Sequence, residues 1–293
     1  MPRVAIAAPD GALLSVRKPI RAAGPWVILL DGIGCDGYIW RYLRPALERN
    51  CRVVHLQYRG HGLSEVPADH AGLTIEQCAR DAWTALRICG FGDGDRAVLV
   101  GHSMGVQVAL EAAHQHIDQV AGLVPICGAF ERPLDTFQGS DVGARILPVL
   151  SGAALKYQQG LRNVWQRLMP TEWAYKLALA TEINAQMIRK EDFLPYFRHM
   201  ARMDPLVFLA YLQDVASHSA RPYLGELAVP ALVVSGQRDH FTPDRLQKEL
   251  AQALPDSELC EIPGGSHTAP LELPELLELR LEDWGRRRGL GLL

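Results

Sequence analysis

The sequence lacks paired or clustered cysteines. Six cysteines lie singly, with no CxxC pair and no cluster with histidine at the spacing of a zinc site. This pattern argues against a disulfide framework and indicates reduced thiols in the protein core. No two histidines stand at helical ligand spacing with a carboxylate either, so we expect no metal ion, and nothing in the sequence calls for a cofactor.

The sequence also lacks an excess of positive charge and any long apolar stretch. Its formal net charge of -3 gives no field of the kind that nucleic-acid backbones require, so we expect no nucleic-acid partner. No run of about 18 or more apolar residues occurs, and the first residues lack the pattern of a signal peptide. We therefore expect a cytoplasmic protein without a membrane span.

Short apolar runs, rich in β-branched residues, alternate with helical patterns along most of the chain. The predicted strands are 4–7, 13–16, 27–30, 52–56, 97–100, 120–127, 231–235 and 259–262. The predicted helices between them are 38–50, 75–89, 104–116, 245–254 and 273–288. Most strands from the third onward are apolar on both faces, as parallel strands covered by helices should be. The alternation predicts an α/β fold with an eight-stranded, mostly parallel sheet.

One long interval interrupts this alternation with helical periodicity and no convincing strand. Its predicted helical segments are 144–157, 161–168, 172–187, 193–200 and 206–218, separated by prolines. Eleven Lys and Arg against nine Asp and Glu leave the interval nearly neutral, which does not favour electrostatic capture of a highly charged substrate. We expect residues 129–225 to form a helical cap inserted into a core of residues 1–128 and 226–293.

The strongest chemical signal is Gly101-His102-Ser103-Met104-Gly105, between a predicted strand and a predicted helix. A serine in such a sharp turn takes strained backbone angles, and larger neighbours two residues away would collide. The N-terminus of the helix adds N–H groups and a positive dipole end for a developing oxyanion. The motif predicts Ser103 as a nucleophile, with His102 packing beside it rather than acting as its base.

A serine nucleophile needs a base to take its proton and an acid to orient that base. Asp239 lies in a loop after the seventh predicted strand, and His267 lies in a glycine-rich loop after the eighth. Parallel strands bring these loops to the same edge of the sheet. The order Ser, Asp, His along the chain is the one found with a serine in this strand-turn-helix motif, the nucleophile elbow. Glu131 and Asp135, after the sixth strand, are rival acids, and we favour Asp239.

Taken together, these motifs resemble an α/β-hydrolase of the esterase, lipase and lactonase group with a helical cap after the sixth strand. The matching segments are 29–34, 58–64, 101–105, 236–239 and 264–267. The resemblance implies an oxyanion hole formed by the backbone N–H groups of Ile33 and Met104. The sequence departs from it at Asp31, where members usually carry histidine, and at Gln57, where they usually carry aspartate. We expect Asp31 to point away from the site and to accept hydrogen bonds from its own loop backbone.

The other histidines have weaker claims to a role. We expect His61, in a tight turn, to make hydrogen bonds with the backbone. The remaining histidines have no partner motif in the sequence; they are His55, His70, His114, His116, His199, His218 and His240.

The resemblance implies a serine hydrolase that acts through an acyl-enzyme on a small to medium, largely apolar carboxylic ester or lactone. The same triad would also serve a C–C bond hydrolase, an enol-lactonase or a cofactor-free perhydrolase. A non-catalytic ligand-binding protein on the same scaffold is a further hypothesis, against which the intact motifs argue. The sequence separates neither these reactions nor the oligomeric states.

Overall fold

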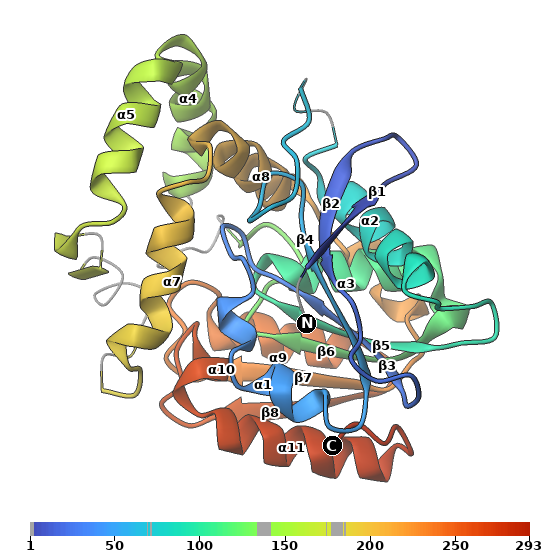
Figure 1. Cartoon of the computed structure of the whole chain (residues 1–293). Helices are drawn as coiled ribbons and strands as arrows, with labels where there is room; N and C mark the ends of the chain where they lie inside the picture. Colours follow the sequence, from blue (N-terminus) through green and yellow to red (C-terminus); the bar gives the residue numbers. More distant parts are fainter. Residues whose placement is uncertain are drawn as a thin grey trace.

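The centre of the molecule is one sheet of eight strands, in the order β1-β2-β4-β3-β5-β6-β7-β8 (Figure 1). The computed structural model describes residues 3–68, 70, 72–133, 142–173, 175–176, 184 and 186–293. The strands are β1 (Val4–Ala7), β2 (Leu13–Arg17), β3 (Trp26–Leu30), β4 (Arg52–Gln57), β5 (Ala97–His102), β6 (Val120–Ile126), β7 (Ala231–Gly236) and β8 (Ser257–Ile262). The β1-β2 and β2-β4 pairs are antiparallel and all other pairs are parallel. The predicted eight-stranded, mostly parallel sheet is confirmed.

Strand β3 explains why the central strands read as continuous apolar runs. Its five residues are all buried, and they alternate between the two faces of the sheet. Ile28 and Leu30 belong to the apolar core on one face, and Val27 and Leu29 belong to the core on the other. A strand covered on both faces has no side that tolerates polar residues.

Helices cover both faces of the sheet (Figure 1). The first core joins β3 and β4 to α2 (Ile75–Ile88), α3 (Met104–Gln115) and α9 (Asp244–Ala253). The second core joins the opposite face to α1 (Leu43–Leu47) and α11 (Pro274–Arg287). Shorter helical segments are η1 (Tyr38–Trp40), η2 (Ile117–Gln119), η5 (Arg221–Glu226) and α10 (Ala269–Glu272). This arrangement is the doubly wound layer structure that the alternating pattern predicted.

The predicted helix at 38–50 is wrong as a continuous element. The chain forms the short turn η1, then a separate helix α1 that begins at Leu43. Pro45 explains the division, because a proline inside a helix loses one backbone hydrogen bond and clashes with the residue four positions earlier. In α1 it occupies the first turn, where its missing N–H needs no partner.

Between β6 and β7 lie the helices α4 (Val142–Lys156), α5 (Gln158–Leu168), α7 (Lys190–Met200) and α8 (Pro205–Ser217). They correspond to the predicted segments of the interval, except that most of 172–187 falls outside the described residues. Figure 1 shows α4, α5 and α7 standing beside the body that contains the sheet, with α8 above the strands. A hydrogen bond of 2.6 Å from Trp165 Nε1 to the Met200 carbonyl ties α5 to α7.

Two properties expected from composition can be compared with the described residues. In that part of the chain no helix combines the length and the apolar character needed to cross a membrane. All six cysteines are free thiols, five of them buried and Cys89 half-buried.

Candidate active site

The Gly101–Gly105 turn carries the serine at the point where β5 passes into α3. Ser103 has φ 55° and ψ −119°, a strained conformation for a residue with a side chain. A Cβ at position 101 would lie 2.1 Å from the Gly105 carbonyl oxygen, and one at position 105 would lie 2.1 Å from that of Leu30. Both glycines are therefore required by close backbone approach, as the sequence motif predicted.

The three residues of the predicted triad lie together at the carboxyl ends of their strands. His267 Nε2 is 2.9 Å from Ser103 Oγ, and His267 Nδ1 is 2.9 Å from Asp239 Oδ2. The Asp239 carboxylate is buried and can only accept hydrogen bonds, so His267 Nδ1 carries the proton between them. Nε2 is then left to accept from the serine hydroxyl.

The loop after β7 fixes the Asp239 carboxylate with three further donors. Oδ1 accepts from the backbone N–H groups of Phe241 and Thr242, each at 2.8 Å, and Oδ2 accepts from Thr242 Oγ1 at 2.8 Å. This is the local turn that an aspartate makes with residues two and three positions further on. Thr242 was not predicted from the sequence, although its position three residues after Asp239 is the signal that could have identified it.

The rival acids are placed differently. Glu131 forms an ion pair with Arg221 and accepts a hydrogen bond of 3.0 Å from Ser219 Oγ. Asp135 lies outside the described residues. Of the two acids that lie in the described part of the chain, Asp239 is the one that contacts His267.

A buried glutamate, which the sequence analysis missed, anchors the His267 loop. Glu272 accepts hydrogen bonds from the Ser266 hydroxyl, from the Ser266 N–H at 2.6 Å and from Thr268 Oγ1 at 2.9 Å. These bonds fix the backbone on both sides of His267. A Ser-x-Thr pair followed by a glutamate on the next helical turn is a common surface pattern, so sequence alone gave no reason to single it out.

His102 supports the same loop from the other side. It is buried, its Nε2–H donates to the His267 carbonyl oxygen at 2.8 Å, and burial lowers its pKa to about 3. The ring is therefore neutral at ordinary pH, and it packs against the His267 ring with centroids 5.0 Å apart. This matches the packing position that the sequence predicted for His102.

The loop after β3 presents free backbone donors beside Ser103. Within the described part of the chain, the N–H groups of Ile33 and Met104 have no hydrogen-bond partner. His61 steadies this loop, since its Nε2 accepts from the Gly34 N–H at 2.9 Å and its Nδ1 donates to the Arg59 carbonyl oxygen. Burial lowers the pKa of His61 to about 4, which keeps the ring neutral and able to accept that bond. The expected backbone contacts of His61 are present.

The expectation for Asp31 was wrong in its partners. Its carboxylate accepts from His55 Nε2 at 2.9 Å and from Trp40 Nε1 at 2.5 Å, not from its own loop backbone. Arg3 Nη2 donates to His55 Nδ1 at 2.6 Å, so the proton of this imidazole must sit on Nε2, facing Asp31. Burial acts to raise the pKa of Asp31, but the bonds from His55 and Trp40 and the Arg3 guanidinium outweigh it and lower the pKa.

This network also corrects the view of His55, which had no partner motif in the sequence. Asp31 and His55 are both fully buried, and burial lowers the pKa of His55. Asp31 is absent from the lining of the cavity beside Ser103, so its charge is held away from that cavity by buried partners.

The second departure, Gln57, bridges two loops. Its Nε2 donates to the Asp36 carbonyl oxygen at 3.2 Å, and its Oε1 accepts from the Leu63 N–H at 3.0 Å. A carboxylate at this position would accept the second bond but could not donate the first. The amide therefore suits a backbone arrangement that offers one acceptor and one donor.

A small cavity of about 20 Å³ adjoins Ser103. This is room for about one water-sized group. Its apolar lining comes from the loop after β3, from α3, from α8 and from the loop after β7; the side chains include Ile33, Met104, Leu212, Val215 and Phe241. The site thus places a hydrogen-bonded serine, two free N–H donors and an apolar recess together. Among the described residues no group of His, Cys, Asp and Glu side chains is arranged to hold a metal ion.

Comparison with known proteins supports this architecture. A family model described as the alpha/beta hydrolase family matches residues 27–278. A polyketide synthase, ThaQ of Burkholderia thailandensis, is 29% identical over 272 residues, which are 92% of this chain but only 12% of that protein. The chain therefore corresponds to a small part of that synthase.

Two further relatives match over most of their own length. The protein named "Putative carbamate hydrolase RutD" of Klebsiella pneumoniae subsp. pneumoniae is 28% identical over 251 residues, 84% of this chain and 87% of that protein. The solved structure of the enol-lactonase from Burkholderia xenovorans LB400 has a TM-score of 0.75 at 22% identity, covering 96% of this chain and 99% of that chain. The likeness to this structure confirms the predicted α/β-hydrolase fold.

Proposed function

Because the chain belongs to the alpha/beta hydrolase family, we propose that it is a serine hydrolase that cleaves a small to medium, largely apolar carboxylic ester or lactone. The observation that carries the proposal is the hydrogen-bonded row of Ser103, His267 and Asp239. An imidazole whose Nδ1 proton is held by a carboxylate can accept the serine proton at Nε2. The proposed reaction passes through an acyl-enzyme on Ser103.

The proposed steps use only side chains and backbone groups of this site. His267 Nε2 takes the Ser103 proton while Oγ attacks the carbonyl carbon, and the new oxyanion accepts hydrogen bonds from the N–H groups of Ile33 and Met104. As this intermediate collapses, the leaving oxygen takes the proton from His267 and departs as an alcohol. A water molecule, deprotonated by His267, then attacks the acyl group and releases the acid. Loss of one such oxyanion donor costs about a hundredfold or more in rate in other enzymes.

We assign a division of labour between two parts of the chain. In this proposal residues 1–128 and 226–293 form the catalytic core, and residues 129–225 form a cap. Support comes from α8, because Leu212 and Val215 line the cavity beside Ser103. Further support comes from α7, where Phe193 packs its ring against Tyr38 with centroids 5.6 Å apart.

The small apolar cavity supports a short acyl group rather than a long one. A buried methylene gains about 0.8 kcal/mol, so a substrate benefits from each carbon that fits and loses when the recess is full. A recess of about 20 Å³ fills after very few carbon atoms.

Carbamate hydrolysis is the second candidate function. A carbamate presents a small, planar carbonyl group that fits the same recess, and one relative carries that activity in its name. The same serine, base and oxyanion donors would serve. Enol-lactone opening, C–C bond hydrolysis and perhydrolysis use the same triad and would be separated by substrate alone.

Covalent labelling tests the nucleophile. A fluorophosphonate should add to Ser103 and to no other serine, and Ser103→Ala should abolish both labelling and turnover. Labelling of another serine, or full activity in Ser103→Ala, would overturn the assignment, and absence of any labelling would favour a non-catalytic ligand-binding protein.

A substrate panel tests the reaction. One preparation of the enzyme is assayed on short acyl esters, lactones, carbamates and ring-cleavage diketones, with Ser103→Ala as the blank. We expect the highest kcat/KM on a short ester or lactone. A carbamate preferred by tenfold or more would establish the second candidate, and preference for a diketone would move the enzyme to C–C bond hydrolysis.

A further inference from the structure

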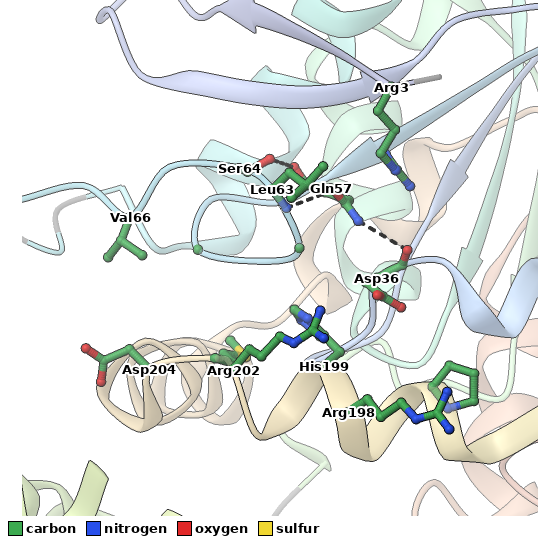
Figure 2. Close-up of a pocket in the computed structure, with 14 residues that line it drawn as sticks. Arg3, Asp36, Gln57, Leu63, Ser64, Val66, Arg198, His199, Arg202 and Asp204 are labelled. Carbon is green, nitrogen blue, oxygen red and sulfur yellow. Dashed lines mark hydrogen bonds between the residues drawn. The ribbon is translucent and has the colours of Figure 1, made fainter. Parts of the chain in front are cut away.

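A second, much larger cavity lies away from Ser103. Its volume is about 630 Å³, and it is bordered by the segment from Gln57 to Val66 on one side and by the end of α7 with the following turn on the other. It shares no lining residue with the small cavity beside Ser103. Figure 2 shows Arg202 and His199 on the helix side, facing Asp36 and Gln57. The volume falls within the range of about 300–1,000 Å³ that small-molecule sites occupy.

The lining of this cavity has an excess of positive charge. Arg3, Arg198 and Arg202 contribute guanidinium groups. Among the described residues, no carboxylate lies within ion-pair distance of Arg198 or Arg202, and both side chains are exposed to solvent. Two arginines without partners in one recess repel each other unless an anion joins them.

The two carboxylates of the lining do not cancel this charge. Asp204 is already engaged, because its Oδ2 accepts from Arg162 Nε at 3.1 Å and Nη2 at 2.7 Å, and its Oδ1 accepts from the Leu206 N–H. Arg3 is also engaged, because its guanidinium donates to His55 and to the Ser15 carbonyl oxygen. Asp36 therefore remains as the one carboxylate to set against the two unpaired guanidinium groups of Arg198 and Arg202. The charge inventory thus leaves a net excess of cations in the cavity.

His199 supplies an independent sign of a missing partner. Only 6% of its surface is exposed, and its Nε2 is buried without a hydrogen-bond partner among the described residues. A buried imidazole nitrogen left unpaired costs free energy, so such atoms are normally satisfied by protein, water or ligand. His199 lines this cavity, and its Nε2 lies beneath the lining with almost no accessible surface.

We propose that this cavity is a second binding site, for a small polar anion. A phosphate or carboxylate group of the ligand is held by Arg198 and Arg202, since the planar guanidinium fork pairs with two oxygens of such a group. Hydroxyl or amino groups elsewhere on the ligand meet the Asp36 carboxylate. The site is independent of hydrolysis at Ser103.

Titration calorimetry at low ionic strength tests the proposal, with inorganic pyrophosphate and citrate as probes. The Ser103→Ala protein is used beside the natural one, so that failure of the proposed hydrolase function leaves this test intact. We expect saturable binding of at least one probe by both proteins. The probe that binds more tightly identifies phosphate or carboxylate as the preferred group. If neither pyrophosphate nor citrate gives a heat of binding, the proposal is wrong.

A pair of double variants then locates the site. Arg198→Gln with Arg202→Gln should weaken binding at least about tenfold, since bonds to charged groups contribute about 1.5–3 kcal/mol each. Arg167→Gln with Arg189→Gln is the matched control, because it removes the same charge from exposed positions outside the lining and should change affinity less than about twofold. Equal weakening in both would mean that net charge alone attracts the anion, and the site would be rejected. Circular dichroism confirms that both variants are folded.

Discussion

His267 and His55 are each held in one tautomer by the group that contacts their Nδ1. Asp239 accepts the proton of His267 Nδ1 and leaves Nε2 for Ser103. Arg3 donates to His55 Nδ1 and leaves the Nε2 proton for Asp31. The first arrangement presents an acceptor where a proton must be taken, and the second presents a donor to a buried carboxylate. In each ring, the hydrogen bond at Nδ1 thus determines whether Nε2 accepts or donates a proton.

The tautomer argument predicts the effect of Asp239→Asn. The new amide nitrogen would face His267 Nδ1 as a donor, so the proton would move to Nε2 and Ser103 would lose its base. We expect kcat to fall by a factor on the order of 10⁴, as in other triads with this change, while the fold persists. Steady-state kinetics and circular dichroism measure the two effects. Glu131→Gln is the control and should retain turnover; the reverse result would assign the acid to Glu131.

Two buried neutral histidines predict how stability depends on pH. The folded-state pKa values of His61 and His102 are about 4 and about 3, below the ordinary 6.5, so the unfolded chain binds protons first as pH falls. Their stabilisation is complete above about pH 6.5 and is lost below it, at about 1.4 kcal/mol per pH unit for each histidine. Urea unfolding at pH 7, 6 and 5 should show this decline.

A variant tests whether His102, and not the carboxylates of the protein, contributes to this dependence of stability on pH. His102→Gln, which can still donate to the His267 carbonyl, should reduce the slope between pH 6 and 5 by the share of one histidine, about 1.4 kcal/mol per pH unit. The exposed His240→Gln should leave the slope as it is. An unchanged slope in His102→Gln would contradict the assignment.

The meeting of Ser103, Asp239 and His267 at one edge of the sheet was predictable because each residue belongs to a local motif. Ser103 lies between two glycines, and Asp239 and His267 each lie in a loop directly after a predicted strand. The Asp31–His55 pair was not predictable, because it joins side chains at the ends of adjacent strands whose register is set by the assembled sheet. Glu272 was missed for the opposite reason, since its contacts are local but its pattern is common.

At the level of elements, the junction of β5 and α3 has no room for a side chain at either of its two glycines. A Cβ at position 105 would lie 2.1 Å from the Leu30 carbonyl oxygen and 2.8 Å from that of Asp31. Gly105→Ala should therefore push α3 away from β3 and lower the free energy of unfolding by about 3 kcal/mol. Thermal and urea unfolding measure the loss.

Gly160→Ala is the matched control for this substitution. Gly160 lies inside helix α5 with no heavy atom within 4 Å of its Cβ position. There alanine should raise stability by about 0.5–1 kcal/mol, since it favours the helix. A cost at position 160 similar to that at position 105 would mean that helix propensity, and not the collision, governs both.

Most strands and core helices were predicted to within a few residues, because burial on both faces leaves a continuous apolar signature. The helix at 38–50 was the clear failure. Its apolar periodicity was real, since Ile39, Trp40, Leu43 and Leu47 are all buried, but Pro45 divides the backbone that carries it. Periodicity reports which side chains face the core and does not report whether the backbone between them is continuous.

On the scale of the whole molecule, the proposed function makes the core and the helices between β6 and β7 jointly responsible for the size of the substrate. The recess beside Ser103 is closed by α8 through Leu212 and Val215. Across p-nitrophenyl esters we expect kcat/KM to peak at short acyl chains and then fall, without a jump in rate at an oil-water interface. A flat profile, or a maximum at long chains with interfacial activation, would refute the closed recess.

Enlarging the recess provides the internal comparison. Val215→Ala removes two methyl groups from its wall and should move the optimum of the ester series to a longer chain. Val149→Ala, an exposed position on α4, makes the same change of side chain and should leave the optimum in place. Equal shifts in both variants would show that the acyl group does not meet α8.

The larger cavity, of about 630 Å³, could not be predicted from the sequence. The interval between β6 and β7 is nearly neutral by composition, and this argued against charge-based binding. The cavity joins Arg198 and Arg202 from that interval to Arg3 and Asp36 from the other end of the chain. A local charge can therefore be strong in a region whose total charge is small, because folding selects which charged residues become neighbours.

The Asp31–His55 pair constrains the paths by which this sequence can diversify. Replacing Asp31 alone by the histidine expected from the family resemblance would set two imidazoles face to face, with Arg3 behind one of them. Replacing His55 alone would leave the buried carboxylate with Trp40 Nε1 as its one remaining side-chain donor among the described residues, and the loss of a partner from a buried charge is among the more destabilising single changes. Each position therefore restricts what the other can become, and a lineage that changes this pair must accept a weakened intermediate or exchange both residues together.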